Sequence, residues 1–274
     1  MTIRRLCIVG DSHVGAVKLG WDLISDENRS WEVDFFGAVG DSIGSLLIKG
    51  GELSPSVQSV RDSFALTSKG QNSIRTQNYD AFVIVSAGLG ATVLTRRICA
   101  THSLASCYEP GSSPISRACL RDTVFNAIDS GAAMATARKL RSMTTAPVAL
   151  LPTPLPSIEV LEADADKAIV FRASGMLAEI KHLYELSATR LEVNEGFAFI
   201  SQPAETLDTP CYTRREFAAG GVNLTGRAKR DGDNFCHMNS NYGAIVMGLL
   251  LAHADSACRA VPSAAASAVN AALS

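Results

Sequence analysis

Short apolar runs recur along the chain and are separated by longer segments with helical periodicity. Five of these runs span residues 6–9, 31–36, 81–85, 148–151 and 197–200, and each is followed by glycine, proline or serine. Runs of this length that end at such residues are typical of strands, and a continuous run rich in β-branched residues is typical of a strand covered on both faces. The pattern therefore predicts about five buried strands.

The segments between the runs carry apolar residues at the spacing of an amphipathic helix. This spacing predicts helices at about residues 14–24, 122–143, 166–190 and 239–253, with Asn239 as an acceptable N-cap of the last one. Strands that alternate with helices form a parallel sheet with right-handed crossovers and helices on both faces. We therefore expect a three-layer α/β protein.

The chain shows no internal repeat and no linker, so one domain is expected over residues 1–254, followed by an Ala/Ser-rich tail at 255–274. In a parallel sheet, ligands bind at the carboxyl ends of the strands. Two segments at that edge, 94–121 and 203–232, are longer than a minimal crossover needs. We expect the first of them to cover the site as a lid.

The composition is that of a globular protein and argues against several classes of partner. Hydrophobic residues make up 47% of the 274 residues and the net charge is −2, so neither nucleic acid nor an anionic membrane is expected as a partner. The longest apolar run, residues 244–252, is too short to cross a membrane, and the N-terminus has no signal-peptide pattern. These features predict a cytoplasmic protein and leave its oligomeric state open.

Neither metal nor cofactor chemistry is indicated. The seven cysteines are odd in number and not evenly spaced, which argues against a disulfide framework. Cys99, His102, Cys107 and Cys119 share one segment, but no Cys-x-x-Cys pair is present and their spacing matches no zinc pattern. The glycine motifs of nucleotide-binding folds are also absent. We expect no metal and no cofactor.

The first apolar run ends in Gly10-Asp11-Ser12-His13, directly before the first predicted helix. This places Ser12 at a strand-to-helix corner, with its hydroxyl exposed and its own N–H at the start of the helix. Unpaired N–H groups and the helix dipole favour negative charge there, so the corner suits a nucleophile whose reaction develops an oxyanion. The alternative is that Ser12 only caps the helix. A second Gly-Asp-Ser at 40–42 shows that the tripeptide alone carries little weight.

A serine nucleophile needs a base, and an imidazole base needs an orienting acceptor on its other nitrogen. Of the five histidines, His13 adjoins Ser12 but is expected to point along the helix, away from the hydroxyl. His237 follows an irregular loop just before the last helix, and Asp233 precedes it by four residues. We therefore expect His237 to be the base and Asp233 to orient it, with a satisfied surface histidine as the alternative.

These motifs resemble the sequence blocks of the SGNH (GDSL-type) hydrolase superfamily. Gly10-Asp11-Ser12 matches the first block, in which the serine is the nucleophile, and Gly40 after the second strand matches the glycine that donates an N–H to the oxyanion. Residues 233–237 resemble the last block, Asp-x-x-His. The resemblance spans nearly the whole chain and implies a flavodoxin-like α/β fold.

Two positions depart from the family pattern. The third block has an asparagine that supplies another oxyanion donor, and Gly90 stands in its place here, after Gly88. We expect the Gly90 N–H or the Thr92 hydroxyl to replace that donor. In the last block the family spacing falls on Asn234 rather than Asp233, and a one-residue bulge would let Asp233 orient the histidine.

The resemblance implies a serine esterase or O-acyl hydrolase that acts on an ester-bearing small molecule or glycan through an acyl-enzyme. An O-acyltransferase with the same nucleophile, and a non-catalytic binding protein that keeps the pocket, are the alternatives. The expected catalytic residues are Ser12, His237 and Asp233. The expected oxyanion hole comprises Ser12, Gly40 and Gly90, and the expected substrate-binding residues are Asp11, His13, Gly88 and Thr92.

Overall fold

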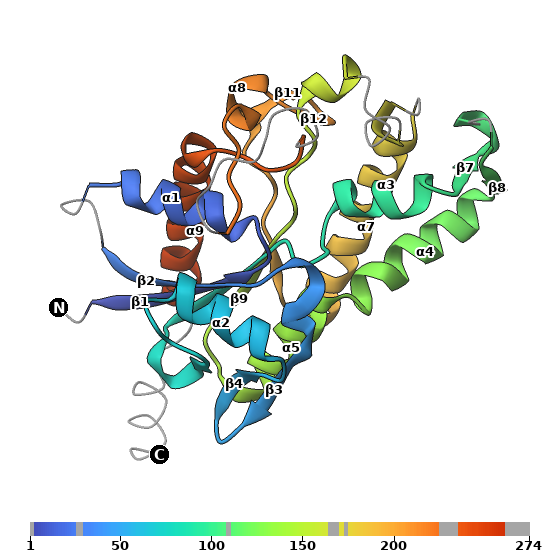
Figure 1. The fold of residues 1–274 in the computed structure, drawn as a ribbon. Coiled ribbons are helices and arrows are strands. Elements are labelled where there is room, and N and C mark those ends of the chain that lie inside the picture. Colours follow the sequence, from blue (N-terminus) through green and yellow to red (C-terminus); the bar gives the residue numbers. More distant parts are fainter. Residues whose placement is uncertain are drawn as a thin grey trace.

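A five-stranded parallel sheet forms the centre of the computed structural model (Figure 1). The structure describes residues 3–25, 30–107, 111–163, 170–172, 175–224 and 235–260. The order across the sheet is β10–β9–β6–β1–β2. The strands are β1 (Arg4–Gly10), β2 (Trp31–Gly37), β6 (Ala81–Val85), β9 (Val148–Leu151) and β10 (Ala198–Phe199). Each coincides with a predicted run and all four pairings are parallel, so the predicted sheet is confirmed.

Helices cover both faces of this sheet (Figure 1). One face carries α1 (Val14–Leu23) and α9 (Ser240–Ala260), and the other carries α2 (Gln58–Thr67), α4 (Arg117–Asp129), α5 (Ala132–Met143) and α7 (Met176–Glu195). Leu6 and Ile8 of β1 face the first pair, whereas Cys7 and Val9 face the second group. Because consecutive strand residues point to opposite faces, a strand covered twice is apolar throughout. The predicted three-layer α/β fold is confirmed.

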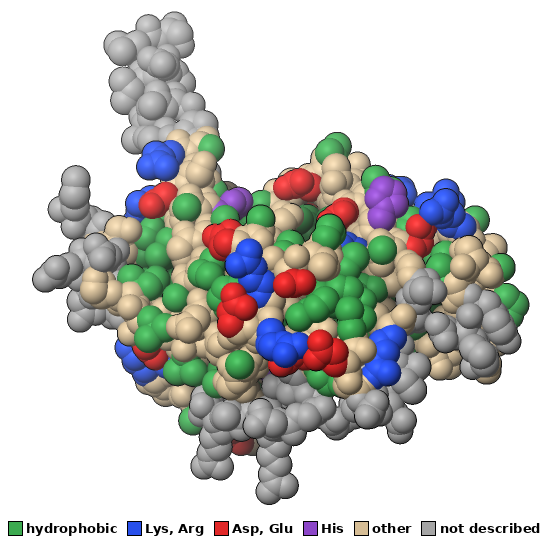
Figure 2. Space-filling model, turned by 90° about the horizontal axis from the view of Figure 1, so that it is seen from above, with side chains coloured by type: hydrophobic (Ala, Val, Ile, Leu, Met, Phe, Trp, Pro, Cys, Tyr) green, Lys and Arg blue, Asp and Glu red, His purple; other side chains and the backbone are tan. Residues whose placement is uncertain are grey.

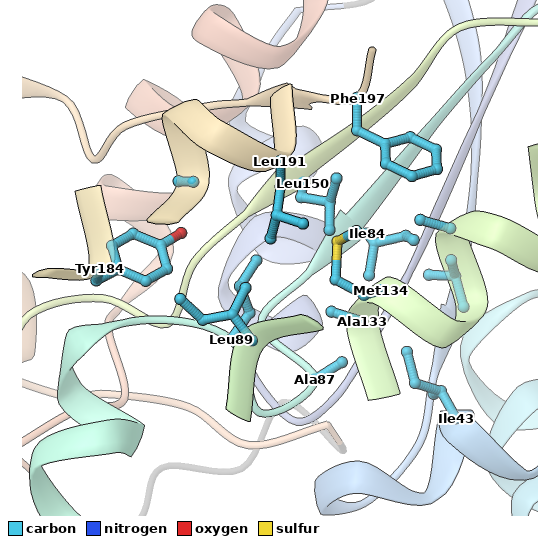
Figure 3. Packing of buried hydrophobic residues seen from close by; sticks show 14 of the residues in the cluster. Ile43, Ile84, Ala87, Leu89, Ala133, Met134, Leu150, Tyr184, Leu191 and Phe197 are labelled. Carbon is cyan, nitrogen blue, oxygen red and sulfur yellow. The ribbon is translucent and has the colours of Figure 1, made fainter. Parts of the chain in front are cut away.

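Side chains from α5, α7 and the sheet interdigitate in the larger of the two apolar layers. Figure 3 shows Ala133 and Met134 of α5 gathered with Ile84 of β6, Leu150 of β9 and Leu191 of α7. None of these side chains is more than 2% exposed. Full burial of a side chain the size of leucine contributes about 1.5–3 kcal/mol. This layer therefore holds the helices firmly on the sheet.

The helix predicted over residues 122–143 is two helices in the structure. α4 ends before Ser130, Gly131 adopts an extended conformation (ψ 162°), and α5 begins at the next residue. Glycine disfavours a helix interior by about 1 kcal/mol relative to alanine. The break lets α4 pack on α7 while α5 packs on the sheet. The predicted helical periodicity is confirmed, and the predicted continuity is wrong.

The two C-terminal helices extend beyond their predicted ends. α7 ends at Gly196, which adopts the left-handed conformation (φ 68°) that glycine reaches at little cost. The predicted start of that helix, residues 166–175, lies partly outside the described residues. Asn239 caps α9 as predicted, since its Oδ1 accepts a bond from the Tyr242 N–H (3.1 Å). Residues 261–274, which make up most of the predicted tail, lie outside the described residues.

The segment predicted to form a lid, residues 94–121, mostly packs away from Ser12, and only its first turns in α3 (Ala91–Cys99) approach the loop after β2 and the segment before α9. The segment comprises most of α3, then β7 (His102–Leu104), η4 (Ala105–Cys107), β8 (Ser113–Ile115) and the start of α4. The Leu104 N–H donates to Sδ of Met176 at the start of α7 (3.4 Å). Figure 1 shows β7 and β8 beyond α3, on the side away from α1. The lid prediction is wrong because the segment forms regular structure that packs on α7.

Short elements that the hydrophobic pattern did not predict fill the remaining connections. Three of them form an antiparallel sheet: β3 (Leu46–Lys49), β4 (Glu52–Pro55) and β5 (Ile74–Arg75). The others are η2 (Gly40–Ser45), η3 (Thr76–Asn78), η5 (Ile158–Leu161), η6 (Ala204–Thr206), β11 (Leu207–Thr209), β12 (Tyr212–Thr213) and α8 (Arg215–Ala218). Five of these elements, β5, η3, η6, β11 and β12, contain only two or three residues, too few for a period to be recognised.

The surface mixes charge types. Figure 2 shows acidic and basic side chains interspersed with hydrophobic ones on one face of the molecule. This distribution agrees with the net charge of −2, which leaves neither sign in clear excess. Among the described helices, none is both long enough and apolar enough to cross a membrane.

α1 and α9 touch through their backbones. A Cβ added at Gly20 of α1 would lie 2.0 Å from the carbonyl carbon of Gly243 in α9. A Cβ added at Gly243 would lie 1.8 Å from the Ala16 carbonyl oxygen. No side chain fits at such distances, so this approach requires glycine at both positions.

Replacing Gly243 with alanine should destabilise the protein by about 1–3 kcal/mol, because the added methyl group overlaps the Ala16 carbonyl and forces the helices apart. For a chain of this size about 1 kcal/mol lowers the melting temperature by roughly 2–4 °C, which thermal unfolding measures. Gly248→Ala on the same helix, where an added Cβ meets nothing within 4 Å, is the control and should be neutral or stabilising. Equal melting temperatures for Gly243→Ala and the wild type would contradict the close packing.

Candidate active site

Ser12 lies where β1 passes into α1. β1 ends at Gly10 and α1 begins at Val14. The carbonyls of Asp11 and Ser12 accept bonds from the N–H groups of Val14 (3.1 Å) and Gly15 (3.2 Å). No residue in the described part of the chain accepts a hydrogen bond from the Ser12 N–H. An unpaired N–H at the start of a helix can bind a developing anion.

The Ser12 hydroxyl and the His237 imidazole lie within hydrogen-bond distance, 2.8 Å from Oγ to Nε2. Both residues are half-buried, and 225 positions separate them in the sequence. Each lies just before one of the two helices that meet through glycine, Ser12 before α1 and His237 before α9. The pair has the geometry that a serine nucleophile and its base require.

Backbone contacts hold the segment that carries His237. The side-chain amide of Asn239 donates to the carbonyls of Glu216 (2.7 Å) and Ala219 (2.9 Å), which lie in and after α8. A Cβ added at Gly221 would lie 2.2 Å from the His237 carbonyl oxygen, so the two backbones run directly against each other. The imidazole therefore projects from a segment that is restrained by its neighbours.

The His13 ring stacks on the His237 ring, with centroids 4.6 Å apart and planes inclined by 15°. The prediction that His13 points along α1, away from Ser12, is wrong. His13 is the N-cap residue of α1 and has helical backbone angles (φ −71°, ψ −17°). Because Cα–Cβ bonds in a helix tilt toward its N-terminus, the side chain is directed back to the place where Ser12 meets His237.

The Asp11 carboxylate is buried and accepts three hydrogen bonds. Oδ1 accepts from the His13 N–H (3.0 Å), and Oδ2 accepts from Ser86 Oγ (2.6 Å) and the Ala87 N–H (3.0 Å). Burial raises the pKa of Asp11 above its ordinary value, while these bonds and the nearby His237 act to lower it. Because the carboxylate faces the loop after β6, Asp11 supports the site from within, contrary to the substrate-binding role expected for it.

The loop after β6 has a strained backbone. Ser86 (φ 59°) and Ala87 (φ 54°) have positive φ although neither is glycine. Besides its bond to Asp11, Ser86 Oγ lies within hydrogen-bond distance of Thr153 Oγ1, and the Ser86 N–H donates to the Leu151 carbonyl (2.7 Å). Strain of this kind persists only where the surroundings enforce it, and it clusters at functional sites. Asp11 and Thr153 supply that restraint.

Gly40 and Gly88 both lie beside Asp41, whose carboxylate forms an ion pair with α3. Arg97 of α3 pairs with Asp41, and a Cβ added at Gly88 would lie 2.6 Å from Asp41 Oδ1. Gly40 opens η2 with φ 56°, is exposed, and has open space where a side chain would stand. Gly40 is therefore accessible, as an oxyanion donor must be, whereas Gly88 contacts the Asp41 carboxylate.

Gly90 and Thr92 pack against the loop after β9. Gly90 has φ 118°, and a Cβ there would lie 2.9 Å from Cβ of Pro152. Thr92 is fully buried, and its hydroxyl donates to the Pro154 carbonyl (2.6 Å). Contrary to the expectation, the Thr92 hydroxyl has no hydrogen left to donate to a substrate or an oxyanion.

Ser42, in the second Gly-Asp-Ser, is used within its own turn. Its Oγ donates to the Val39 carbonyl (2.6 Å), and its N–H donates to the same oxygen (3.4 Å). No histidine in the described part of the chain is bonded to the Ser42 hydroxyl. The second tripeptide therefore matches the first in sequence and not in surroundings.

Two arginines of α3, which no sequence motif indicates, border the site. Arg97 pairs with Asp41, and Arg96 Nη2 lies 3.3 Å from Sγ of Cys236, the residue before His237. α3 therefore reaches from the loop after β2 to the segment before α9. Gly90 before a helical segment with two arginines in its last turn is a helix signal, although the sequence pattern predicts a long connection from residue 94.

The residue expected to orient His237 lies outside the described part of the chain. Residues 225–234 include both Asp233 and Asn234, so the choice between them stays a prediction. Within the described ranges, no group of three or more His, Cys, Asp or Glu side chains is placed to hold a metal ion.

No protein-family model and no curated protein matches this chain. Several solved structures have a similar overall course of the chain. An extracellular lipase from Streptomyces rimosus is 14% identical, with a TM-score of 0.47 over 91% of this chain and 99% of its own. An acetyl xylan esterase is 12% identical (TM-score 0.41; 91% and 98% covered). The periplasmic domain of a lipopolysaccharide acetyltransferase from Salmonella ser. Paratyphi A is 9% identical (TM-score 0.41; 90% and 82% covered). At these identities no residue role passes from those proteins to this one.

Replacing Asp11 with alanine should destabilise the protein by about 2–4 kcal/mol, because the buried Ser86 hydroxyl and Ala87 N–H lose their acceptor. Urea denaturation measures this loss as a lower midpoint at an unchanged slope. Asp22→Ala, which removes a carboxylate of α1 that is 54% exposed, is the control and should change stability by less than about 0.5 kcal/mol. Wild-type stability in Asp11→Ala would show that the carboxylate does not hold the loop.

Proposed function

We propose that this chain is a serine acyl hydrolase of the SGNH (GDSL-type) superfamily, with Ser12 as nucleophile and His237 as general base. The observation that carries the proposal is the 2.8 Å distance from Ser12 Oγ to His237 Nε2 at the carboxyl edge of a parallel sheet. A serine hydroxyl becomes a strong nucleophile when a neighbouring imidazole can take its proton. The N–H of Ser12 at the start of α1 meets the second requirement, a hydrogen-bond donor for the oxyanion.

In the proposed reaction His237 Nε2 takes the proton from Ser12 Oγ as Oγ bonds to the ester carbonyl carbon. The carbonyl π electrons move onto the oxygen, and the N–H groups of Ser12 and Gly40 donate to that oxyanion. The positive end of the α1 dipole lies at the same place. On collapse, the leaving alkoxide takes the proton from Nε2, and the acyl group stays on Oγ. Water then attacks in the same way and releases the acid.

We assign Asp233 to the other imidazole nitrogen of His237, with Asn234 as the alternative. A carboxylate in that position orients the ring and stabilises the imidazolium that forms during proton transfer. An amide accepts the same hydrogen bond but carries no charge. We therefore prefer Asp233 to Asn234, because only the carboxylate carries the charge that stabilises the imidazolium.

The proposed substrates are esters of small molecules or glycans. The acyl-enzyme on Ser12 does not itself decide the acceptor, because water and an alcohol attack the same carbonyl carbon. Transfer to an alcohol would make the protein an O-acyltransferase. Product analysis with and without a sugar acceptor distinguishes the two reactions.

A fluorophosphonate probe should label the wild type and fail to label Ser12→Ala, because the probe reacts with a serine whose proton an imidazole can take. Intact-protein mass spectrometry measures the modification. Ser42→Ala is the matched control and should label normally, since the Ser42 hydroxyl is bonded to the Val39 carbonyl. Labelling that survives in Ser12→Ala would reject the nucleophile. A wild type that neither labels nor turns over esters would favour a non-catalytic binding protein.

Hydrolysis of short-chain nitrophenyl esters should be slow. Loss of one side-chain oxyanion donor costs about 10²–10³ in rate, and here Gly90 has no side chain while the Thr92 hydroxyl is bonded to Pro154. Gly90→Asn should lower the melting temperature instead of raising kcat, because φ 118° and the contact with Pro152 leave no room for a side chain. Fast turnover by the wild type, or a gain in Gly90→Asn, would contradict this account of the oxyanion hole.

A further inference from the structure

His13 lies against the face of His237, a contact that the reaction described above does not use. The rings are stacked with centroids 4.6 Å apart, while His237 Nε2 lies 2.8 Å from Ser12 Oγ. The His237 ring therefore meets two consecutive residues, Ser12 at its edge and His13 on its face.

The backbone sets the position of the His13 ring. The His13 N–H donates to Asp11 Oδ1 (3.0 Å), and Asp11 is itself buried and bonded to Ser86 and Ala87. α1 begins at the residue after His13, which holds the backbone in helical angles. The ring therefore projects from a restrained point and closes one face of the imidazole.

Hydrogen bonds at the ring nitrogens of an imidazole lie in the plane of the ring, and they weaken when the ring rotates about its side-chain bonds. A second ring against its face opposes that rotation, and a hydroxyl–imidazole bond depends on alignment as well as distance. A displaced catalytic group lowers the rate even when the fold is intact. The stacked His13 ring therefore restrains the direction in which Nε2 of His237 points.

We propose that His13 is a positioning residue whose ring stacks on His237 and keeps Nε2 in line with the Ser12 hydroxyl. This rests on the proposed function, in which His237 is the base, and it replaces the expectation that His13 binds substrate. The contact orients the base and touches no reacting atom. Its loss therefore lowers kcat and leaves KM unchanged.

Three single variants separate the ring contact from other roles. His13→Ala removes the ring, His13→Phe keeps an aromatic ring without its nitrogens, and His182→Ala removes an exposed histidine of α7 as a control. Each is measured for kcat and KM on a short-chain nitrophenyl ester and for its rate of fluorophosphonate labelling. His13→Ala should lose about 3- to 10-fold in kcat and in labelling rate at unchanged KM. His13→Phe and His182→Ala should stay within about twofold of the wild type.

Proton NMR of the His237 ring gives a readout that needs no turnover. An aromatic ring shifts the resonances of protons that lie over its face, so the His237 ring signals should move in His13→Ala and stay near their wild-type positions in His13→Phe. A wild type that neither labels nor turns over defeats the proposed function. If His237 does not act as a base, His13 has no base to position, and its proposed role is overturned as well.

Three further results would overturn the proposal while leaving the proposed function intact. Wild-type rates in His13→Ala would show that the stack does not matter. A raised KM at unchanged kcat would return His13 to substrate binding. His13→Phe as slow as His13→Ala would show that the ring nitrogens act and the ring face does not.

Discussion

The backbone contact between α1 and α9 is the constraint on which the candidate site depends. Gly20 and Gly243 let the two helices meet at distances that no side chain allows. Ser12 precedes one of these helices and His237 the other, so the helix separation sets the separation of hydroxyl and imidazole. A hydrogen bond of 2.8 Å between them would not survive a shift of about 1 Å. Both helices also bury the apolar face that includes Leu6, so the packing that stabilises this side of the sheet also shapes the site.

A buried carboxylate joins this helix pair to the rest of the sheet edge. Asp11 bonds to Ser86 in the loop after β6, and Ser86 in turn meets Thr153 in the loop after β9. Three adjacent strands therefore end in loops that share one hydrogen-bonded network. Burying a charge is costly, as the raised pKa of Asp11 shows, and three donors offset that cost. The same carboxylate fixes the backbone of His13, whose ring covers His237.

The candidate catalytic pair could be predicted from the sequence because its signals are local. A Gly-Asp-Ser tripeptide between a strand and a helix, and a histidine before a capped helix, are visible in a few residues each. The supporting residues were not predictable in this way. Asp11 and Thr92 carry side chains suited to binding a substrate, yet both turn inward, toward Ser86 and Pro154. Those partners lie 75 and 62 positions away, where no local pattern can report them.

The sequence by itself determined the strands, the layer order and most helices, because burial on one or both faces imposes a period on neighbouring residues. The apolar period ran across Gly131, so the break between α4 and α5 was not predicted. Only the tertiary structure decided where side chains point once the layers meet. The His13 ring lies on His237 and not along α1, because the α1–α9 contact brings a residue from the far end of the chain to its side. Contacts of that kind depend on which segments pack together, and no short stretch of sequence carries that information.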